Sequence, residues 1–150
     1  MGFNGSFDLV IDDKGRISIP SKFGKELQSN GHESLYITNF VQSDEYCLLL
    51  FPAKHWDTFA AKFHSHRTMD DRAQLIETFF LAGAHEVPID RQGRILIPQK
   101  LREFAGIERE VILTGKNDRM ELWEQGRFKK IWNLALEMVR NRQYRDSADI

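Results

Sequence analysis

Residues 11–22 read IDDKGRISIPSK, and residues 89–100 read IDRQGRILIPQK. The two stretches are offset by 78 positions (89 − 11), and eight of their 12 paired residues are identical. Unrelated stretches of this length share about one identity by composition. A repeat of this kind determines the whole architecture, so the chain is treated as two related units.

Each copy of the repeat predicts a turn, a strand and a helix, in that order. Aspartate can cap a turn and glycine supplies positive φ, which together predict turns at 12–15 and 90–93. The alternating residues that follow, 16–19 and 94–97, predict strands with one apolar and one polar face. The next residue is proline, which suits the first turn of a helix because its missing N–H is not needed there.

The rest of the chain continues this alternation of strands and helices. The predicted strands are 7–11, 16–19, 35–38, 47–51, 87–89, 94–97, 110–114 and 120–123, and the predicted helices are 20–29, 54–66, 70–82, 98–105 and 127–142. The fold class is therefore α+β, with repeat 1 at 6–53, a helical linker at 54–83, repeat 2 at 84–125, and a C-terminal helix and tail at 126–150. Half a chain of this length buries too little surface alone, so we expect the two halves to share one core.

Composition excludes several classes of protein. With 150 residues, 41% of them hydrophobic and 29% charged, the chain has the balance of a soluble globular domain. No apolar run is long enough to cross a bilayer, and the N-terminus lacks the basic and apolar regions of a secretory signal. The single cysteine, Cys47, lies in an apolar run, which favours a buried structural thiol in a reducing compartment. We therefore expect a cytoplasmic protein without membrane contact.

The arginines that follow the two turns need a further explanation. Turn geometry accounts for four residues: Asp12, Gly15, Asp90 and Gly93. Arg16 and Arg94 begin strands, where β-propensity gives no reason for arginine. Two equivalent arginines on two equivalent turns indicate a symmetric anionic target. The structural alternative is an ion pair between the aspartate and the arginine of each turn, and both can hold because a carboxylate can orient a guanidinium for a phosphate or a base edge.

Lysines add positive charge near both turns. Lys22 and Lys100 follow the repeated proline by two residues, in the first helical turn, where a cation opposes the helix dipole. Residues 12–25 carry four basic and two acidic side chains, and residues 90–102 carry four basic and one acidic, although the whole chain has a net charge of −1. Positive charge concentrated at the turns is typical of a nucleic-acid interface.

Signals of an enzyme are poor. His64 and His66 are two residues apart in a predicted helix, so their imidazoles would face different sides and form no metal-ligand pair. No glycine-rich phosphate loop follows a strand, and no serine or cysteine lies in a nucleophile elbow. We therefore expect no enzyme activity, no metal, no cofactor and no small-molecule substrate.

The motif of turn, strand and proline resembles the AbrB-like family of DNA-binding β-hairpin proteins. The resemblance is carried by DxKGR at 12–16 and DxxGR at 90–94, with further similarity in CLLLFP at 47–52, LAGA at 81–84 and ELW at 121–123. The doubled motif is similar to tandem members of that family. This resemblance implies duplicated hairpin units that form one interleaved barrel, of the double-psi or swapped-hairpin kind, with flanking helices.

The same resemblance implies a function and a site. It implies a sequence-specific transcriptional regulator, a repressor, that binds double-stranded promoter repeats upstream of the division and cell-wall gene cluster containing its own gene. It also implies a nucleoid-associated, ring-like homo-oligomer whose paired turns contact DNA. Carried over residue by residue, the DNA-binding residues are Lys14, Arg16, Lys22, Arg91, Arg94, Lys100 and Arg102.

The two copies are not identical at these positions. Gly24 stands where the second copy has Arg102. Gln92 stands where the first copy has Lys14. The resemblance therefore implies that the two halves contribute unequally to DNA contact.

A structural, self-assembling protein without specific DNA binding is the alternative function. Large apolar patches that one chain cannot cover usually mark interfaces. Six aromatic residues on the predicted helices would supply such a patch: Trp56, Phe59, Phe63, Phe79, Phe80 and Trp132. The two functions predict different surfaces. DNA binding requires both arginine turns on one exposed face, whereas assembly is favoured if they are buried between subunits.

Overall fold

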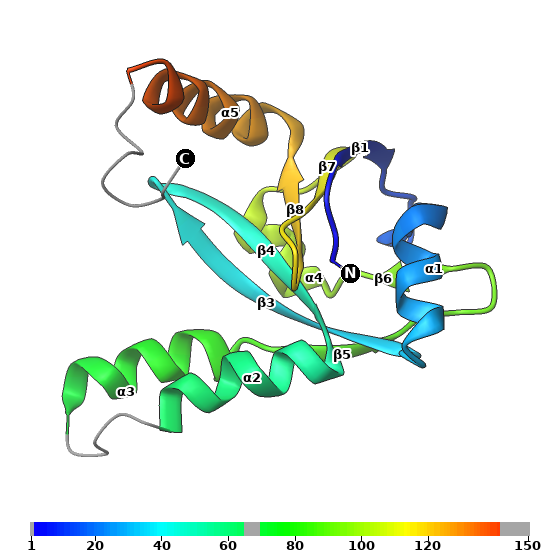
Figure 1. The fold of residues 1–150 in the computed structure, drawn as a ribbon, viewed down its shortest axis with the longest axis horizontal. Coiled ribbons are helices and arrows are strands. Elements are labelled where there is room, and N and C mark those ends of the chain that lie inside the picture. Colours follow the sequence, from blue (N-terminus) through cyan, green and yellow to red (C-terminus); the bar gives the residue numbers. More distant parts are fainter. Residues whose placement is uncertain (1, 65–69, 142–150) are drawn as a thin grey trace.

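The computed structural model describes residues 2–64 and 70–141 (Figure 1). The strands are β1 (Ser6–Val10), β2 (Arg16–Ser18), β3 (Ser34–Gln42), β4 (Glu45–Pro52), β5 (His85–Pro88), β6 (Arg94–Leu96), β7 (Glu110–Gly115) and β8 (Met120–Glu124). The helices are α1 (Ser21–Ser29), α2 (Ala53–His64), α3 (Asp71–Glu77), the π-helical segment η1 (Thr78–Ala82), α4 (Gln99–Ala105) and α5 (Gln125–Arg140). Every predicted strand and helix is present, and the α+β class is confirmed. The predicted ends of helices 54–66 and 127–142 lie outside the described residues.

Strand β3 is longer than the sequence predicts. It runs to Gln42 and pairs with β4 along its length, from Leu35 opposite Pro52 to Gln42 opposite Glu45. The two residues between the strands, Ser43 and Asp44, have φ values of 48° and 65°. Positive φ at both central residues is the geometry of a tight hairpin whose twist matches its strands, so the ladder continues to the turn.

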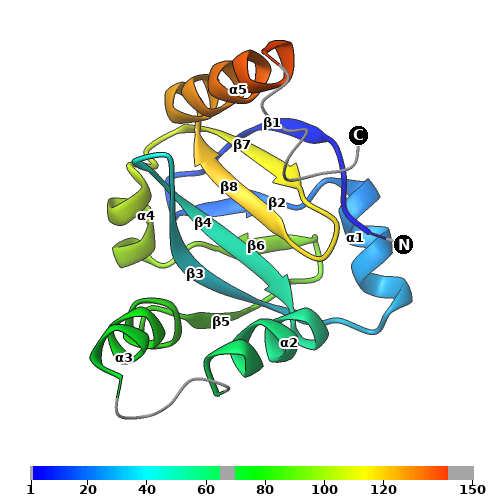
Figure 2. The ribbon, with the colours of Figure 1, turned by 60° about the vertical axis from the view of Figure 1, so that its left-hand side comes forward.

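The strands form two antiparallel sheets. Six strands form one sheet in the order β1-β7-β8-β4-β3-β5, and β2 and β6 form a separate two-stranded ribbon. Figure 2 shows the ribbon beneath the larger sheet, with α4 near one end of it and α1 near the other. The ribbon and the larger sheet therefore enclose an interior between them.

Most strand pairs join one repeat to the other. Strands β1, β2, β3 and β4 of the first repeat pair with β7, β6, β5 and β8 of the second. Among the residues that the structure describes, only the β3–β4 and β7–β8 pairs lie within one repeat. The two repeats are thus interleaved. A closed barrel is not detected among the described residues, so that part of the fold stays a prediction.

One apolar core is built from both repeats, as the length of the repeat predicts. Ile17 and Leu35 of the first repeat and Ile95 and Leu113 of the second are all at most 1% exposed and belong to one cluster. Ile17 lies directly opposite Ile95 in the ribbon, which fixes the ribbon to this core. Neither repeat could form this core alone.

Helices cover the outer face of the larger sheet. Figure 1 shows α5 over the β7–β8 side and α2 and α3 side by side along the β3–β5 side. Under α5, Trp123 and Cys47 are fully buried beside Phe128. Burial raises the pKa of the Cys47 thiol, which fits the predicted structural role. No helix in the described parts of the chain has the length and apolarity to span a membrane.

Five of the six helical aromatic residues expected to supply an apolar patch contact one another within this chain, and of these only Trp56 and Phe63 are buried. Trp56, Phe59, Phe63, Phe79 and Phe80 form a chain of ring contacts between α2 and η1, with centroids 5.0–5.6 Å apart. They pack within one molecule because α2 and η1 lie side by side. Trp132 on α5 is 59% exposed, and four other large apolar residues of α5 are also exposed: Leu134, Leu136, Met138 and Val139.

Candidate nucleic-acid interface

The aspartate of turn 1 (residues 12–15) organises both the backbone and the arginine that follows. Asp12 Oδ1 accepts hydrogen bonds from the backbone N–H groups of Lys14 and Arg16, both at 2.9 Å. Asp12 Oδ2 accepts a hydrogen bond from Arg16 Nε at 2.8 Å. Gly15 closes the turn by donating its N–H to Asp12 O at 3.0 Å, with φ of 89°. Positive φ explains the glycine, and the paired oxygens explain the aspartate.

Turn 2 (residues 90–93) repeats this geometry. Asp90 Oδ1 accepts from the backbone N–H groups of Gln92 and Arg94 at 2.9 Å, and Asp90 Oδ2 accepts from Arg94 Nε at 2.9 Å. Gly93 donates its N–H to Asp90 O at 3.0 Å, with φ of 77°. The structural alternative considered for both turns, an ion pair between aspartate and arginine, is therefore present in each.

Both turn carboxylates are stabilised in the ionised form. The backbone N–H of Arg16 and then its guanidinium hold the pKa of Asp12 below its ordinary value. The same groups of Arg94 lower the pKa of Asp90. Each carboxylate is thus negatively charged at neutral pH and fixes the orientation of its guanidinium.

The ribbon places the two arginines on one face. Arg16 lies opposite Leu96 and Arg94 lies opposite Ser18, with the buried Ile17–Ile95 pair between them. Because side chains alternate across a strand, these four residues share the outer face while the isoleucines point inward. Diagonal neighbours in such a ribbon are about 7–8 Å apart. Within a single chain, both arginines therefore lie on the outer face of the ribbon.

Both arginines keep part of the guanidinium available. Their side chains are 29% and 30% exposed, and each uses Nε for its aspartate. Within residues 2–64 and 70–141, neither Arg16 nor Arg94 has a hydrogen bond or ion pair from its NH1 or NH2 group. The outer edge of each guanidinium can therefore donate two hydrogen bonds to an anion or a base edge.

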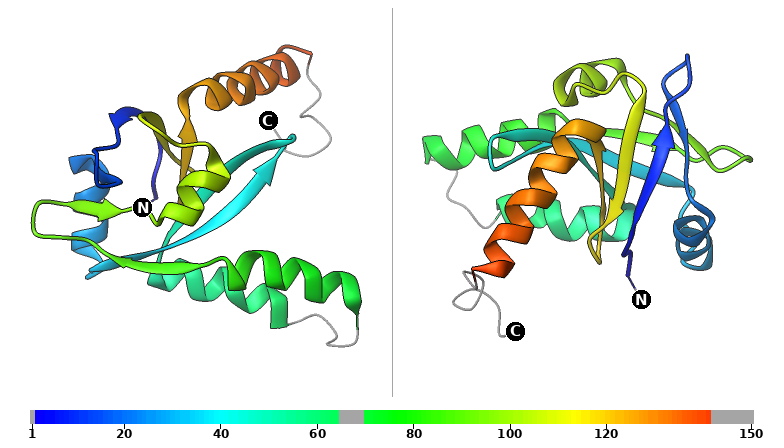
Figure 3. Two further views of the ribbon diagram at one scale, coloured as in Figure 1. Left: turned by 180° about the vertical axis from the view of Figure 1, so that it is seen from behind. Right: turned by 90° about the horizontal axis from the view of Figure 1, so that it is seen from above.

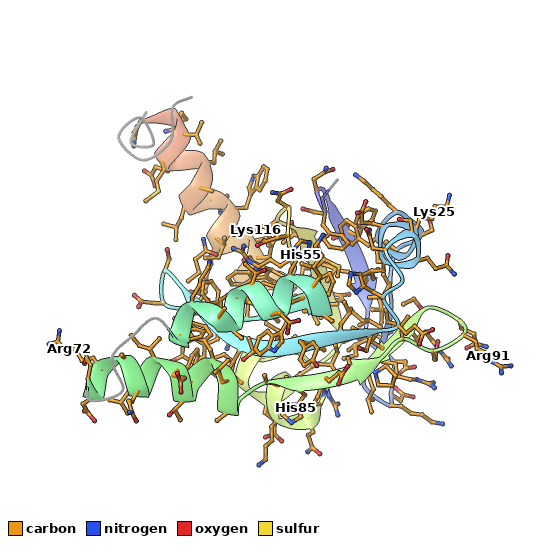
Figure 4. The ribbon with its side chains drawn as sticks, turned by 60° about the horizontal axis from the view of Figure 1, so that its bottom comes forward. Lys25, His55, Arg72, His85, Arg91 and Lys116 are labelled. Carbon is orange, nitrogen blue, oxygen red and sulfur yellow. The ribbon has the colours of Figure 1, made fainter. Side chains whose placement is uncertain are left out.

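The remaining predicted site residues are not equivalent. Lys14, Arg91 and Lys100 are exposed. Figure 4 shows Arg91 extending outward from turn 2, at the same end of the molecule as Lys25 and opposite to Arg72. Lys22 instead donates from Nζ to Asn4 Oδ1 at 2.7 Å, so the N-terminal segment holds it.

Arg102 turns back into the protein. It lies on α4 and donates from Nε to Ile97 O at 2.9 Å, beside turn 1. Sequence reasoning also gave no role to Leu96, which is 50% exposed on the outer face of the ribbon. The repeat alignment provides the signal, since Leu96 is the counterpart of Ser18 (96 − 78), and alternation along residues 16–19 puts Ser18 on the same face as Arg16.

The structure offers no sign of a metal centre in the parts of the chain that it describes. No group of three or more His, Cys, Asp or Glu side chains there is placed to hold an ion. The His66 side chain of the predicted non-ligand pair lies outside the described residues, as does that of His64. The arrangement is thus one of charged hydrogen-bond donors on a narrow ribbon.

The interleaved repeats and paired arginine turns define the class: a tandem-repeat α+β protein with one shared core. A family model described as "MraZ protein, putative antitoxin-like" matches residues 3–79 and again residues 80–146. The chain therefore belongs to the MraZ family. The resemblance proposed from the sequence is confirmed, and the family model assigns α2 and α3 to the first copy and α5 to the second.

Curated relatives bear the same family name. A protein of Acetivibrio thermocellus named "Transcriptional regulator MraZ" is 38% identical over 127 residues, covering 85% of this chain and 84% of the relative. Proteins with the same name from Nitrosomonas europaea and Shewanella baltica are 32% and 33% identical, covering 90% and 94% of this chain and 86% and 91% of the relatives. The similarity thus extends over most of each chain.

Proposed function

We propose that this protein is a sequence-specific transcriptional regulator that binds double-stranded DNA through the β2–β6 ribbon. The observation that carries the proposal is the pair Arg16 and Arg94 on one outer face, each oriented by an ionised aspartate with its outer guanidinium edge available. The names of the relatives, "Transcriptional regulator MraZ", support the same function.

The ribbon has suitable dimensions and chemistry for the major groove. The groove admits a two-stranded β-ribbon, and arginine can donate two hydrogen bonds to the O6 and N7 atoms of guanine. We assign base contact to Arg16 and Arg94. Phosphate contact is assigned to the exposed cations around the turns: Lys14, Lys22, Arg91 and Lys100. Lys22 would first have to leave Asn4.

The regulatory role follows the family resemblance. We propose a repressor that acts on promoter repeats upstream of the division and cell-wall gene cluster that includes its own gene. Its place of action would be the cytoplasm, on the nucleoid. The role is one of binding rather than catalysis, with no cofactor or small-molecule substrate.

Self-association is the second part of the proposal. Trp132 and Val139 on α5 are 59% and 56% exposed. Their apolar surface is unfavourable in contact with water, and an interface between subunits would bury it. A ring-like homo-oligomer would present several ribbons to several promoter repeats and increase the overall affinity. A self-assembling protein without specific DNA binding remains the alternative, and exposed Trp132 and Val139 favour it equally.

DNA binding is tested by gel shift and fluorescence anisotropy with DNA from upstream of the gene and a shuffled duplex of equal composition. Arg16→Ala and Arg94→Ala should each weaken specific binding by about 1–3 kcal/mol if the arginines contact guanine. Arg72→Ala is the matched control, because Arg72 is exposed at the opposite end of the molecule (Figure 4).

Two outcomes would contradict the proposal. Unchanged affinity in both ribbon variants, with circular dichroism showing intact folding, would remove the ribbon from the interface and favour the assembly function. A monomer at micromolar concentration by light scattering would contradict the oligomer.

A further inference from the structure

The counterpart of Arg102 in the first repeat is Gly24 (102 − 78). Each of the two lies near the turn of the opposite repeat. The guanidinium of Arg102 lies against turn 1: a Cβ atom added to Gly15 would be 2.7 Å from Arg102 Cζ and 2.9 Å from its Nε. Gly15 is buried as a result. Arg102 of the second repeat therefore supports a turn of the first repeat.

Turn 2 has no such support. Gly24 presents no side chain, and a Cβ atom added to Gly93 or to Gly24 would meet nothing within 4 Å. A hollow of about 410 Å3 lies there, and its lining includes Gly24, Gln28 and residues 90–93. Figure 3 shows this turn as a loop that projects past α1. The same turn geometry is thus packed on one side of the ribbon and unpacked on the other.

We infer that Arg102 is a positioning residue for the opposite repeat, which holds turn 1 and therefore Arg16 in the DNA-binding conformation, whereas Gly24 leaves turn 2 and Arg94 free to adjust on the DNA. The DNA part of this inference rests on the proposed function. A donor that is fixed before binding loses less conformational freedom on association, so turn 1 contributes a preformed contact and turn 2 an adaptable one.

The shape of the arginine side chain explains why the support is specific. A planar guanidinium can lie flat against a glycine while Nε donates to the Ile97 carbonyl, 2.9 Å away. Lysine has the same charge but no planar group and no Nε–H, so it cannot reproduce this packing. Arg102→Lys therefore keeps any contribution of charge to phosphate binding and removes the support.

The first test needs no DNA. Amide hydrogen exchange is measured by NMR at Gly15 and Gly93, whose N–H groups donate equivalent 3.0 Å bonds to Asp12 and Asp90. Gly15 should exchange about tenfold more slowly than Gly93, because opening of the supported turn must also displace the guanidinium. Arg102→Lys should raise the rate of Gly15 to that of Gly93 and leave Gly93 unchanged.

Gly24→Arg provides the reciprocal variant. It fills the hollow beside turn 2 and should slow exchange at Gly93 without affecting Gly15. Because the substitution adds a side chain to open space, it does not depend on the folding of an Arg102 variant. Equal rates at Gly15 and Gly93 in the natural chain, or no response to either substitution, would overturn the inference whatever the protein binds.

The second test is a double-mutant cycle on DNA. Arg102→Lys should weaken binding about tenfold in the natural chain and in the Arg94→Ala background, but not further in the Arg16→Ala background. An equal loss in both backgrounds would assign Arg102 its own contact with DNA and overturn the inference. If the natural chain binds no DNA, the proposed function fails, and the exchange rates alone decide the role of Arg102.

Discussion

The larger sheet and the ribbon differ in how many of their residues they bury. Strand β8 of the larger sheet buries four of its five residues, whereas β2 and β6 each bury only their central isoleucine. An isolated two-stranded ribbon is marginal in water, so β2 and β6 depend on the core beneath them. Stability therefore resides mainly in the larger sheet, whereas the outer residues of the ribbon can vary at little cost to folding.

Among the substitutions that test where stability resides, Trp123→Ala is expected to have the largest effect. Trp123 is fully buried, and its Nε1 donates to Glu121 Oε1 at 3.1 Å. Truncation should lower the free energy of unfolding by about 4 kcal/mol. Urea denaturation measures the loss, and DNA affinity of the folded protein should stay the same.

An exposed tryptophan provides the control for this variant. Trp132→Ala on α5 should change monomer stability by less than about 0.5 kcal/mol, because Trp132 is 59% exposed. Similar losses in the two variants would show that burial in the larger sheet is not what stabilises the fold.

Ile17→Ala is expected to lower both the stability of the fold and the affinity for DNA. Ile17 is 1% exposed and lies opposite Ile95, so its truncation leaves a cavity under the ribbon itself. Stability should fall by about 3 kcal/mol. Unlike Trp123→Ala, this variant should also bind DNA more weakly in anisotropy titrations under conditions where it is folded. Full affinity in the folded variant would show that DNA binding does not require tight packing between the ribbon and the core.

A smaller difference in stability is expected between glycine substitutions in turn 1 and turn 2. Gly15→Ala and Gly93→Ala both place a side chain at positive φ, 89° and 77°, at about 1 kcal/mol each. Gly15→Ala adds a close approach to the Arg102 guanidinium, which should cost about 1–2 kcal/mol more. Thermal or urea unfolding of the pair measures this difference. Equal losses would mean that Arg102 moves aside freely.

The smallest expected effect is on the pH dependence of stability. The pKa values of Asp12 and Asp90 are lowered in the folded chain by backbone N–H groups of Arg16 and Arg94. Their contribution to stability is therefore present above the unfolded pKa of about 3.9 and is lost as pH falls through the lower folded values. NMR titration of the two carboxyl carbons should give midpoints below the ordinary value. In Asp12→Asn, unfolding should depend less on pH in that acidic range, and midpoints at the ordinary value would contradict the geometry of the turns.

Local patterns in the sequence predicted most elements and the arginine turns. The alternation around Ile17, the positive-φ glycines and the aspartate caps act within a few residues, so they can be recognised in a single stretch. The pairing of β1 with β7 depends on residues about a hundred positions apart, and only the family resemblance indicated interleaving. A long separation in sequence also concealed the contact of Arg102 with Gly15, because the repeat alignment showed only that Arg102 differs from Gly24.

The aromatic residues show a second limit. Helical spacing correctly placed Trp56, Phe59 and Phe63 on one stripe, but spacing does not say what covers a stripe. Here Phe80 of the neighbouring η1 packs against Phe59 and Phe63 at 5.4 and 5.5 Å. A stripe expected to face another subunit is therefore contacted by a helix of the same chain.

The fusion of both repeats into one chain gives the ribbon a direction. Two separate copies of one repeat would place identical residues at both ends, and such a ribbon would bind a palindrome equally well either way round. In this chain Ser18 corresponds to Leu96 and Gly24 to Arg102, so the two ends differ. A ribbon of this kind, bound to DNA as proposed, has a preferred polarity along the duplex. Sites repeated in the same strand orientation would then be occupied by molecules that all point the same way.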